Sequence, residues 1–214
     1  MSPSPVRSLV YNAVISKLTA SWYRAVLERV PPGSRILDVG IGTGQALLAN
    51  RALIRQKDLR VVGVDIDSSY VEACTRAVAG AGLNDRVTVR LESIYDHAAE
   101  PYDAAYFSAS FMLLPDPAAA LHHVVELLAP NGRIYFTQTL EHERSATMER
   151  IKPLLRFFTS IDFGQVTYED ELLHTIEAGN VAILENRVLE EKRKRSFHLI
   201  VGEPTPGNRR SIAQ

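Results

Sequence analysis

The sequence predicts an α/β fold in which a mostly parallel β-sheet is doubly wound, with helices on both of its faces. Short apolar runs, typical of buried parallel strands, alternate along the chain with stretches of helical periodicity. A glycine-rich segment directly follows the first of these runs, as in α/β folds that bind a ligand at the carboxyl ends of their strands. With 214 residues, 46% of them hydrophobic, the chain is sized for a single domain with one sheet.

Strands and helices are expected to follow one another in alternation. The expected strands lie at 35–39, 59–65, 87–91, 102–108, 133–139, 181–189 and 196–201, and the last two form a closing antiparallel hairpin. The expected helices lie at 14–26, 45–55, 68–81, 117–128, 148–158 and 167–176. Serine hydroxyls at Ser68 and Ser69 are expected to cap one helix, and Thr167 is expected to open the last one as part of a capping box.

The charge balance gives no sign of a nucleic-acid partner. Lys and Arg number 24 against 25 Asp and Glu, whereas binding to phosphates requires clustered positive charge. The run 190–195 (EEKRKR) is either a basic patch or a solvated hairpin turn, and the acids that precede its bases favour the turn.

Cys74 is the single cysteine and falls on the apolar face of a helix, so core packing is expected. Neither a secretory signal nor a membrane span is evident, and a cytoplasmic protein is expected.

The glycine loop at 38–45 (DVGIGTGQ) is the first motif that points to a ligand. Glycines at alternate positions allow a sharp turn and a close approach between the backbone and a bound molecule. Such a loop is a weak signal by itself, because glycines also serve tight strand-to-helix turns. The dinucleotide pattern G-x-G-x-x-G would need Gly or Ala at position 45 or 47, where Gln45 and Leu47 stand, so a nicotinamide cofactor is disfavoured.

Asp65 ends the second expected strand. A carboxylate at this position can accept hydrogen bonds from both hydroxyls of a ribose. The alternative is that Asp65 caps the following helix, but Asp67 and Ser68 already fill that role. The ribose interpretation is therefore favoured.

These motifs together carry a resemblance to a known family. ILDVGIGTGQ followed by VVGVDID resembles the first two motifs of the class I S-adenosylmethionine-dependent methyltransferases, which have a Rossmann-like, seven-stranded sheet. LNDRVTVRLES, YDAAYFSASFMLLPDP and LLAPNGRIYFTQT are similar to the family's third, fourth and fifth strands, so the resemblance covers residues 35–140. The hairpin at 181–201 is the family's usual ending. The resemblance implies methyl transfer from S-adenosylmethionine to a small-molecule acceptor.

The resemblance also implies a set of cofactor-binding positions. Asp38 and the glycine loop would hold the methionine portion, Asp65 the ribose and Ile66 the adenine. Ser93-Ile94 stands where the family usually has an acidic residue for the adenine amino group. Ser108 is expected either to face the methionine end or to be only a small polar strand terminus. The implied set is Asp38, Gly40, Gly42, Thr43, Gly44, Asp65, Ile66, Ser93, Ile94 and Ser108.

Methyl transfer is an in-line displacement at a sulfonium, so the protein mainly positions two reactants and excludes water. A general base is needed only when the acceptor arrives protonated. The candidates for that base are His142, Glu141, Tyr11, His97 and Asp96, and the alternative for those in loops is a solvent-exposed residue. His122-His123 lies within a helix and has no third ligand nearby in the sequence, so no metal site is expected.

The absence of two motifs narrows the range of possible methyl acceptors. The stretch 108–111 (SASF) lacks the Asn/Asp-Pro-Pro-aromatic motif by which methyltransferases of exocyclic base nitrogens resemble one another. Methyltransferases of the catechol type bind a metal ion through acidic residues at the ends of their fourth and fifth strands. Here neither strand end carries an acid before Glu141, so metal-independent transfer to a small molecule is expected. Two alternatives stay open, an aminopropyl transferase and a non-catalytic S-adenosylmethionine-binding module. Possible acceptor lining, or else core, is Tyr11, Trp22, Tyr23, Phe111 and Met112.

The expected domain organisation has three parts. Residues 1–30 form a helical lid segment, residues 31–203 form the S-adenosylmethionine-binding domain, and residues 204–214 form a disordered tail.

Overall fold

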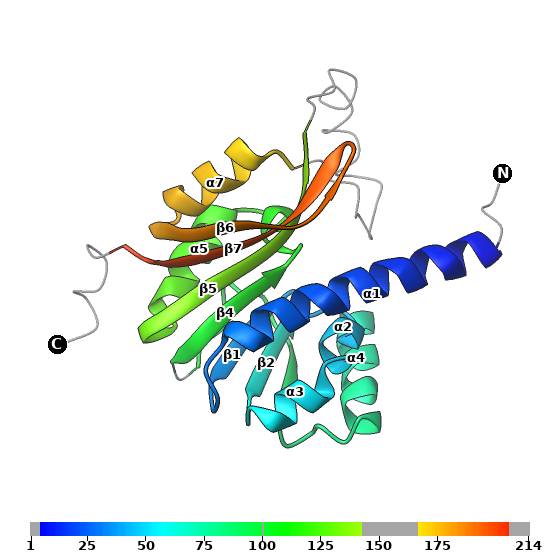
Figure 1. Cartoon of the computed structure of the whole chain (residues 1–214). Helices are drawn as coiled ribbons and strands as arrows, with labels where there is room; N and C mark the ends of the chain where they lie inside the picture. Colours follow the sequence, from blue (N-terminus) through cyan, green and yellow to red (C-terminus); the bar gives the residue numbers. More distant parts are fainter. Residues whose placement is uncertain (1–4, 100, 143–166, 206–214) are drawn as a thin grey trace.

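The computed structural model describes residues 5–99, 101–142 and 167–205, and for residues 5–16 it describes the backbone alone. Seven strands form one sheet (Figure 1). In spatial order the strands are β3 (Val87–Leu91), β2 (Arg60–Asp65), β1 (Arg35–Val39), β4 (Tyr102–Ser108), β5 (Leu128–Glu141), β7 (Arg195–Pro204) and β6 (Val181–Lys192).

The first five strands are parallel, and the hairpin of β6 and β7 adds to β5 in antiparallel orientation. This confirms the predicted sheet and its closing hairpin. Strand β1 pairs with β2 on one side and with β4 on the other, so the strand order reverses at β1. Ligands of such sheets bind at this switch point, beyond the carboxyl ends of the strands.

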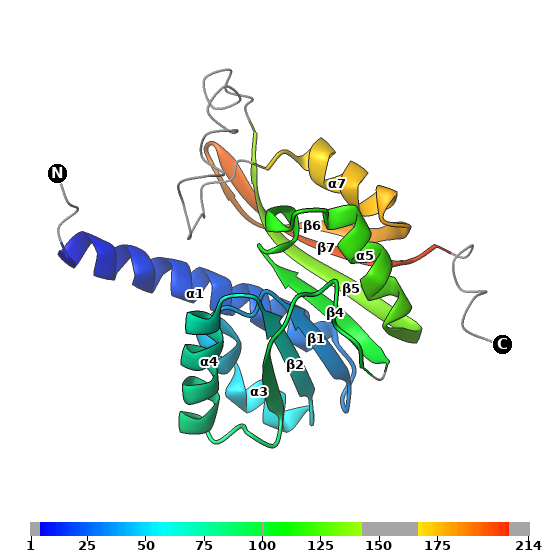
Figure 2. The same cartoon turned by 180° about the vertical axis from the view of Figure 1, so that it is seen from behind.

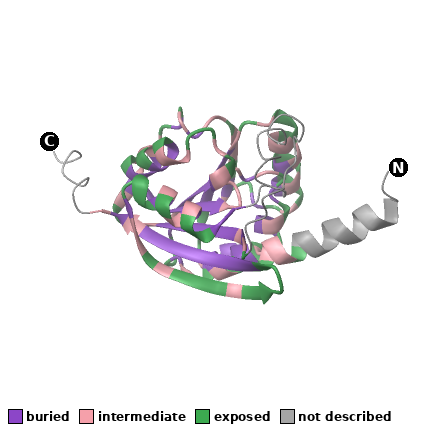
Figure 3. Ribbon diagram, turned by 90° about the horizontal axis from the view of Figure 1, so that it is seen from above, coloured by how far each residue is buried: buried purple, intermediate pink, exposed green. Residues whose placement is uncertain are grey.

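Helices cover both faces of the sheet (Figures 1 and 2). The helices are α1 (Pro5–Arg29), α2 (Gln45–Leu48), α3 (Arg51–Gln56), α4 (Ser68–Gly80), α5 (Pro117–Glu126) and α7 (Glu169–Ala178), with a short 3-10 turn η1 (Phe111–Leu113). Helices α1 to α4 share one apolar cluster with the sheet, and α5 and α7 share the other. Figure 3 shows that the hairpin's inner strand is buried and that its outer strand is exposed.

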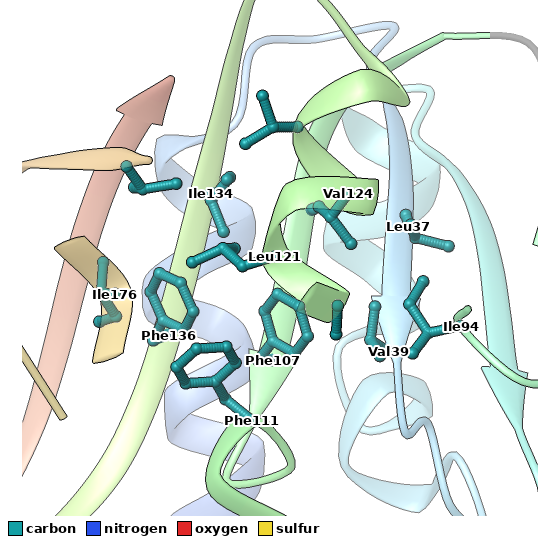
Figure 4. Packing of buried hydrophobic residues seen from close by; sticks show 14 of the residues in the cluster. Leu37, Val39, Ile94, Phe107, Phe111, Leu121, Val124, Ile134, Phe136 and Ile176 are labelled. Carbon is teal, nitrogen blue, oxygen red and sulfur yellow. The ribbon is translucent and has the colours of Figure 1, made fainter. Parts of the chain in front are cut away.

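An aromatic cluster forms the centre of the core on the α5 and α7 side (Figure 4). Phe107 and Phe136 stack at 5.3 Å between ring centroids, and Phe111 meets Phe136 edge-on at 4.9 Å. Phe111 is therefore core and does not line an acceptor site. Met112 also packs against this cluster while staying partly exposed.

Helix α1 is longer than expected, and its C-terminal half is part of the core. Trp22 packs on Phe197 at 5.7 Å between centroids, and Val26 and Val30 have no exposed surface. Both Trp22 and Tyr23 are buried, so the core alternative holds for them rather than acceptor lining. The backbone of the N-terminal half extends beyond the sheet (Figures 1 and 2). No helix among the described residues is long and apolar enough to cross a membrane.

Two helix expectations need correction. The single helix expected at 45–55 is divided into α2 and α3, because the Asn50 side-chain amide donates hydrogen bonds to the carbonyl oxygens of Ala46 and Ala20, at 3.0 and 2.9 Å. The expected capping box is wrong, because α7 begins one residue later, after Tyr168, and has no side-chain cap. The Thr167 hydroxyl instead accepts a hydrogen bond from the buried Gln138 amide.

The start of β5 also differs from the expectation, because the strand begins at Leu128, five residues before the expected 133–139, and α5 ends at Glu126. The other boundaries are close to those expected. The helix expected at 148–158 lies outside the described residues. Charged residues at 192–195 form the exposed end of the hairpin, as the solvated-turn interpretation predicted. Strand β7 continues to Pro204, one residue into the expected tail, and Thr205 donates its N–H to the Asn180 carbonyl at 3.0 Å. Cys74 is buried beneath the glycine loop, as expected.

Candidate functional site

The glycine loop follows β1 and has three residues in the left-handed region, Gly40, Gly42 and Gly44, with φ of +76°, +58° and +69°. A Cβ atom at Gly40 would approach Ser110 Cβ to 2.7 Å, and one at Gly44 would collide with Cys74 Sγ. A Cβ atom at Gly42 would meet nothing within 4 Å. Packing against the protein thus explains two of the glycines, while Gly42 faces open space where a ligand can approach the backbone.

Asp65 holds this loop in place at the end of β2. Its Oδ2 accepts a hydrogen bond from the Gly42 N–H at 2.9 Å, and its Oδ1 accepts one from the Asp67 N–H at 3.0 Å. Asp67 caps α4 through the N–H groups of Ser69 and Tyr70, as the sequence predicted. A carboxylate has about four lone-pair sites, so Asp65 can still accept two hydroxyl donors. The bond from Asp65 to the loop was not predicted from the sequence.

An exposed apolar surface lies beside Asp65. Ile66 is 77% exposed, and Leu91, which pairs with Asp65 at the end of β3, is 58% exposed. Both residues stand at the carboxyl edge, where an adenine ring would find an apolar surface. Leu91 was not among the residues predicted from the sequence, although an apolar residue at the end of the neighbouring strand was a signal for it.

Asp38 is a buried carboxylate with one satisfied oxygen. The Tyr23 hydroxyl donates to Asp38 Oδ2 at 2.9 Å, whereas Oδ1 has no hydrogen-bond partner among the described residues. Burial raises the Asp38 pKa to about 7, the hydrogen bond from Tyr23 lowers it, and the nearby Asp65 charge raises it further. A buried, half-satisfied acceptor costs free energy unless a ligand donates to it.

A second unsatisfied oxygen lies at the end of β4, the neighbour of β1 in the sheet. Ser108 Oγ is buried and meets no hydrogen-bond geometry, although it lies near the Tyr106 hydroxyl. Ser110 donates to the Val39 carbonyl at 2.5 Å and so fastens the loop after β4 to the glycine loop. The carboxyl ends of the paired strands β1 and β4 therefore each present one buried oxygen without a hydrogen-bond partner among the described residues.

The remaining cofactor candidates differ in which of their atoms a ligand could contact. The Ser93 hydroxyl is partly exposed and accepts the Tyr95 N–H at 3.3 Å. The Ile94 side chain is buried in the core, so only its backbone is left for a ligand. Thr43 is exposed at the glycine loop.

His97 does not belong to this edge. Its ring is fully buried between Glu92 Oε2, at 3.0 Å from Nδ1, and the Tyr102 hydroxyl, at 2.8 Å from Nε2. Tyr102 begins β4, so His97 lies toward the amino ends of the strands. The expectation of an exposed loop residue is wrong for His97, which is structural, and right for Asp96.

Glu141 and His142 lie on an extension of β5. Ser108 at the end of β4 pairs with Thr137, so β5 continues past the neighbouring strand. Glu141 is 3.9 Å from Arg195, and the exposed His142 has its Nε2 at 3.0 Å from Ser196 Oγ. The Tyr11 side chain lies outside the described residues.

Comparisons with known proteins agree with this architecture. A family model described as a methyltransferase domain matches residues 37–134. The chain is 33% identical over 127 residues to a ubiquinone biosynthesis O-methyltransferase from Xylella fastidiosa, covering 58% of this chain and 49% of that protein. It is 28% identical over 175 residues to a demethylmenaquinone methyltransferase from Symbiobacterium thermophilum, covering 78% and 64%. The chain thus spans about half to two thirds of the length of these relatives.

Among solved structures, the chain is similar to the [4+2]-cyclase SpnF, with a TM-score of 0.69, 18% identity and coverage of 87% of this chain and 82% of that one. At this identity the likeness shows the fold alone. The matching domain model, the named relatives and the Rossmann-like fold agree with one another. Residues 37–134 thus match a methyltransferase domain, and the chain resembles the class I S-adenosylmethionine-dependent methyltransferases, whose cofactor is S-adenosylmethionine.

Proposed function

We propose that this chain transfers a methyl group to a small-molecule acceptor, without a metal ion. The observation that carries the proposal is that Asp38 Oδ1 and Ser108 Oγ, at the carboxyl ends of the paired strands β1 and β4, are buried without a hydrogen-bond partner among the described residues. The backbone at Gly42, in the loop that follows β1, is open to a ligand. Acceptors that the protein itself leaves unsatisfied fit the donors of a cationic amino-acid group such as that of methionine.

Each part of the cofactor has residues suited to hold it. Asp38 and the open loop at Gly42 would hold the methionine portion, with Thr43 and Ser108 at its margins. Asp65 would bind the ribose through its remaining lone pairs, while it keeps the loop in position. The remaining adenine contacts would come from Ile66, Leu91, Ser93 and the backbone of Ile94.

The bound cofactor supplies a methyl group on a positively charged sulfur, which needs no further activation. The task left to the chain is to orient the acceptor and to exclude water. We propose that the segment 1–30 contains a lid, formed by the half of α1 whose backbone continues past the sheet (Figure 1), while the half with Trp22 and Tyr23 belongs to the core. Residues 31–203 would then form the binding domain, and residues after 204 a tail.

The acceptor class rests on two lines of support. The named relatives are a ubiquinone biosynthesis O-methyltransferase and a demethylmenaquinone methyltransferase, which makes a small molecule the simplest acceptor. The chain also lacks the Asn/Asp-Pro-Pro-aromatic motif after β4, and its net charge is −1. Within the described residues, no group of three or more His, Cys, Asp or Glu could hold a metal ion.

Mass spectrometry of the protein with S-adenosylmethionine and a metabolite extract tests the proposal. We expect a methylated product in a reaction that survives dialysis against a chelator. An aminopropylated product would assign the chain to the alternative transferase, and cofactor binding without any product would make it a binding module. Activity that is lost on chelation and restored by magnesium would contradict the metal-independent mechanism.

A further inference from the structure

Side chains from four elements form a continuous hydrogen-bonded row that ends at His142. The row begins on α7, crosses β6 and β7, and reaches the end of β5. The first link is 2.6 Å long, from Asn186 Nδ2 to Glu169 Oε1, and the second is 2.7 Å long, from His198 Nδ1 to Asn186 Oδ1. The third link is 2.8 Å long, from Ser196 Oγ to His198 Nε2. The last is 3.0 Å long, from His142 Nε2 to Ser196 Oγ. Ser196 and His198 are buried, whereas His142 is exposed.

Glu169 sets the direction of the donors in this row. An ionised carboxylate can only accept, so the Asn186 amide must turn its NH₂ group toward Glu169. The Asn186 oxygen then faces His198 Nδ1 and can only accept from it. His198 is therefore protonated at Nδ1. The opposite direction would place the amide oxygen against the carboxylate oxygen, which is repulsive.

The same direction continues to the exposed end. Burial lowers the pKa of His198, which favours the neutral ring with a lone pair at Nε2. Ser196 has one hydroxyl proton and donates it to that lone pair. The Ser196 oxygen can then only accept from His142 Nε2–H. His142 is thereby held as the Nε2–H tautomer, and its Nδ1 carries a free lone pair.

We infer that His142 Nδ1 is the general base of this transferase, and that Glu169, Asn186, His198 and Ser196 are positioning residues that fix its tautomer. The inference rests on the proposed function and narrows the acceptor to molecules whose reacting atom bears a proton, such as phenolic hydroxyls. The acceptor proton passes to Nδ1 as the acceptor oxygen bonds to the methyl carbon, and the sulfur keeps the electrons of the broken bond. His142 ends as an imidazolium that still donates to Ser196.

His142 follows β5 where that strand continues past Ser108, at the same edge of the sheet as the candidate cofactor site. Ser196 and His198 lie on the buried strand β7, while Asn186 on β6 and Glu169 on α7 are exposed at the far end of the row. The row thus holds one nitrogen of the ring and leaves the other free for an acceptor.

Nitrogen-15 NMR of the histidine rings tests the tautomer in the full chain without cofactor or acceptor. We expect His142 Nδ1 to resonate as an unprotonated nitrogen in the wild type. Ser196→Ala and Glu169→Gln should both yield a mixture of tautomers, because Ala removes the link and a Gln amide can face Asn186 in either orientation. Glu177→Gln makes the same charge change at the exposed far end of α7 and should leave the spectrum unchanged. A protonated Nδ1 in the wild type, or an unchanged tautomer in Glu169→Gln, would overturn the inference.

The rate measurement tests the base itself. With the acceptor found by the mass-spectrometric screen, or with hydroxybenzoates as probes, His142→Gln should lower kcat by about 10²- to 10⁴-fold. Its calorimetric affinity for S-adenosylmethionine should stay unchanged. An unchanged kcat, or an identified acceptor whose reacting atom bears no proton, would refute the base. A wild-type chain that binds no S-adenosylmethionine would instead refute the proposed function, whatever tautomer NMR finds.

Discussion

The Tyr23 hydroxyl donates a 2.9 Å hydrogen bond to the Asp38 carboxylate and so joins α1 to β1 at the candidate site. The Tyr23 ring also meets Tyr106 edge-on, at 4.9 Å between centroids. Because both contacts are buried, the position of α1 and the charge of Asp38 are coupled. A change in the packing of this helix is therefore expected to alter the position or charge of Asp38 at the candidate cofactor site.

Asp38 should make the stability of the ligand-free protein fall as pH rises from about 4 to 7. The folded-state pKa is about 7, whereas an unfolded Asp titrates near 3.9. Between these values the unfolded chain releases a proton that the folded chain keeps, so the free energy of unfolding declines with pH, by at most roughly 4 kcal/mol. Asp38→Asn should lack this decline. Urea unfolding of both proteins at pH 4 and pH 8 measures it, and parallel losses in the two would contradict the assignment.

Asp65→Ala should lower the affinity for S-adenosylmethionine by at least about tenfold. The variant loses charge-assisted hydrogen bonds to the ribose, worth roughly 1.5–3 kcal/mol each, together with the anchor of the Gly42 N–H. Asp67→Ala is the matched control, because it removes the cap of α4 at a partly exposed carboxylate. The control should cost about 1 kcal/mol of stability and leave affinity intact. Equal calorimetric affinities for the wild type and Asp65→Ala would refute the ribose role.

Gly42→Ala and Gly44→Ala should separate binding from folding. Both substitutions place a Cβ atom in the left-handed region, at a cost of about 1–2 kcal/mol. Gly44→Ala adds a collision with Cys74 and should lower the melting temperature further. Gly42→Ala projects only into open space, so its main effect should be lost cofactor affinity. Normal affinity in a folded Gly42→Ala protein would show that no ligand occupies that space.

Deletion of residues 1–16 tests the lid. The packed half of α1, including Trp22, Tyr23 and Val26, stays in the truncated chain. The melting temperature should therefore change little, whereas transfer should be abolished because water reaches the reacting atoms. A truncated protein with a normal melting temperature and normal methylation would eliminate the lid. A lower melting temperature would mean that these residues only pack on the fold.

Local patterns in the sequence were enough to predict the cofactor loop and its neighbours. The glycines at 40, 42 and 44, the acid ending β2 and the cap at Asp67 all depend on turn geometry or strand ends, which a few adjacent residues determine. Two predictions of the same local kind were wrong, namely the single helix across Asn50 and the capping box at Thr167. At Asn50 a side chain reached another helix, and at Thr167 it reached another strand, in place of the expected local bond.

The sequence by itself determined the alternation of strands and helices, the closing hairpin and the family motifs, because these arise from residue periodicity and short-range backbone chemistry. The tertiary structure alone decided which distant side chains meet. It placed Tyr23 on Asp38, buried His97 against Tyr102, and aligned Ser196 with His142. Such pairs depend on strand order and register across the whole sheet. No window of neighbouring residues encodes that information, since it is fixed only when the separate elements pack into one core.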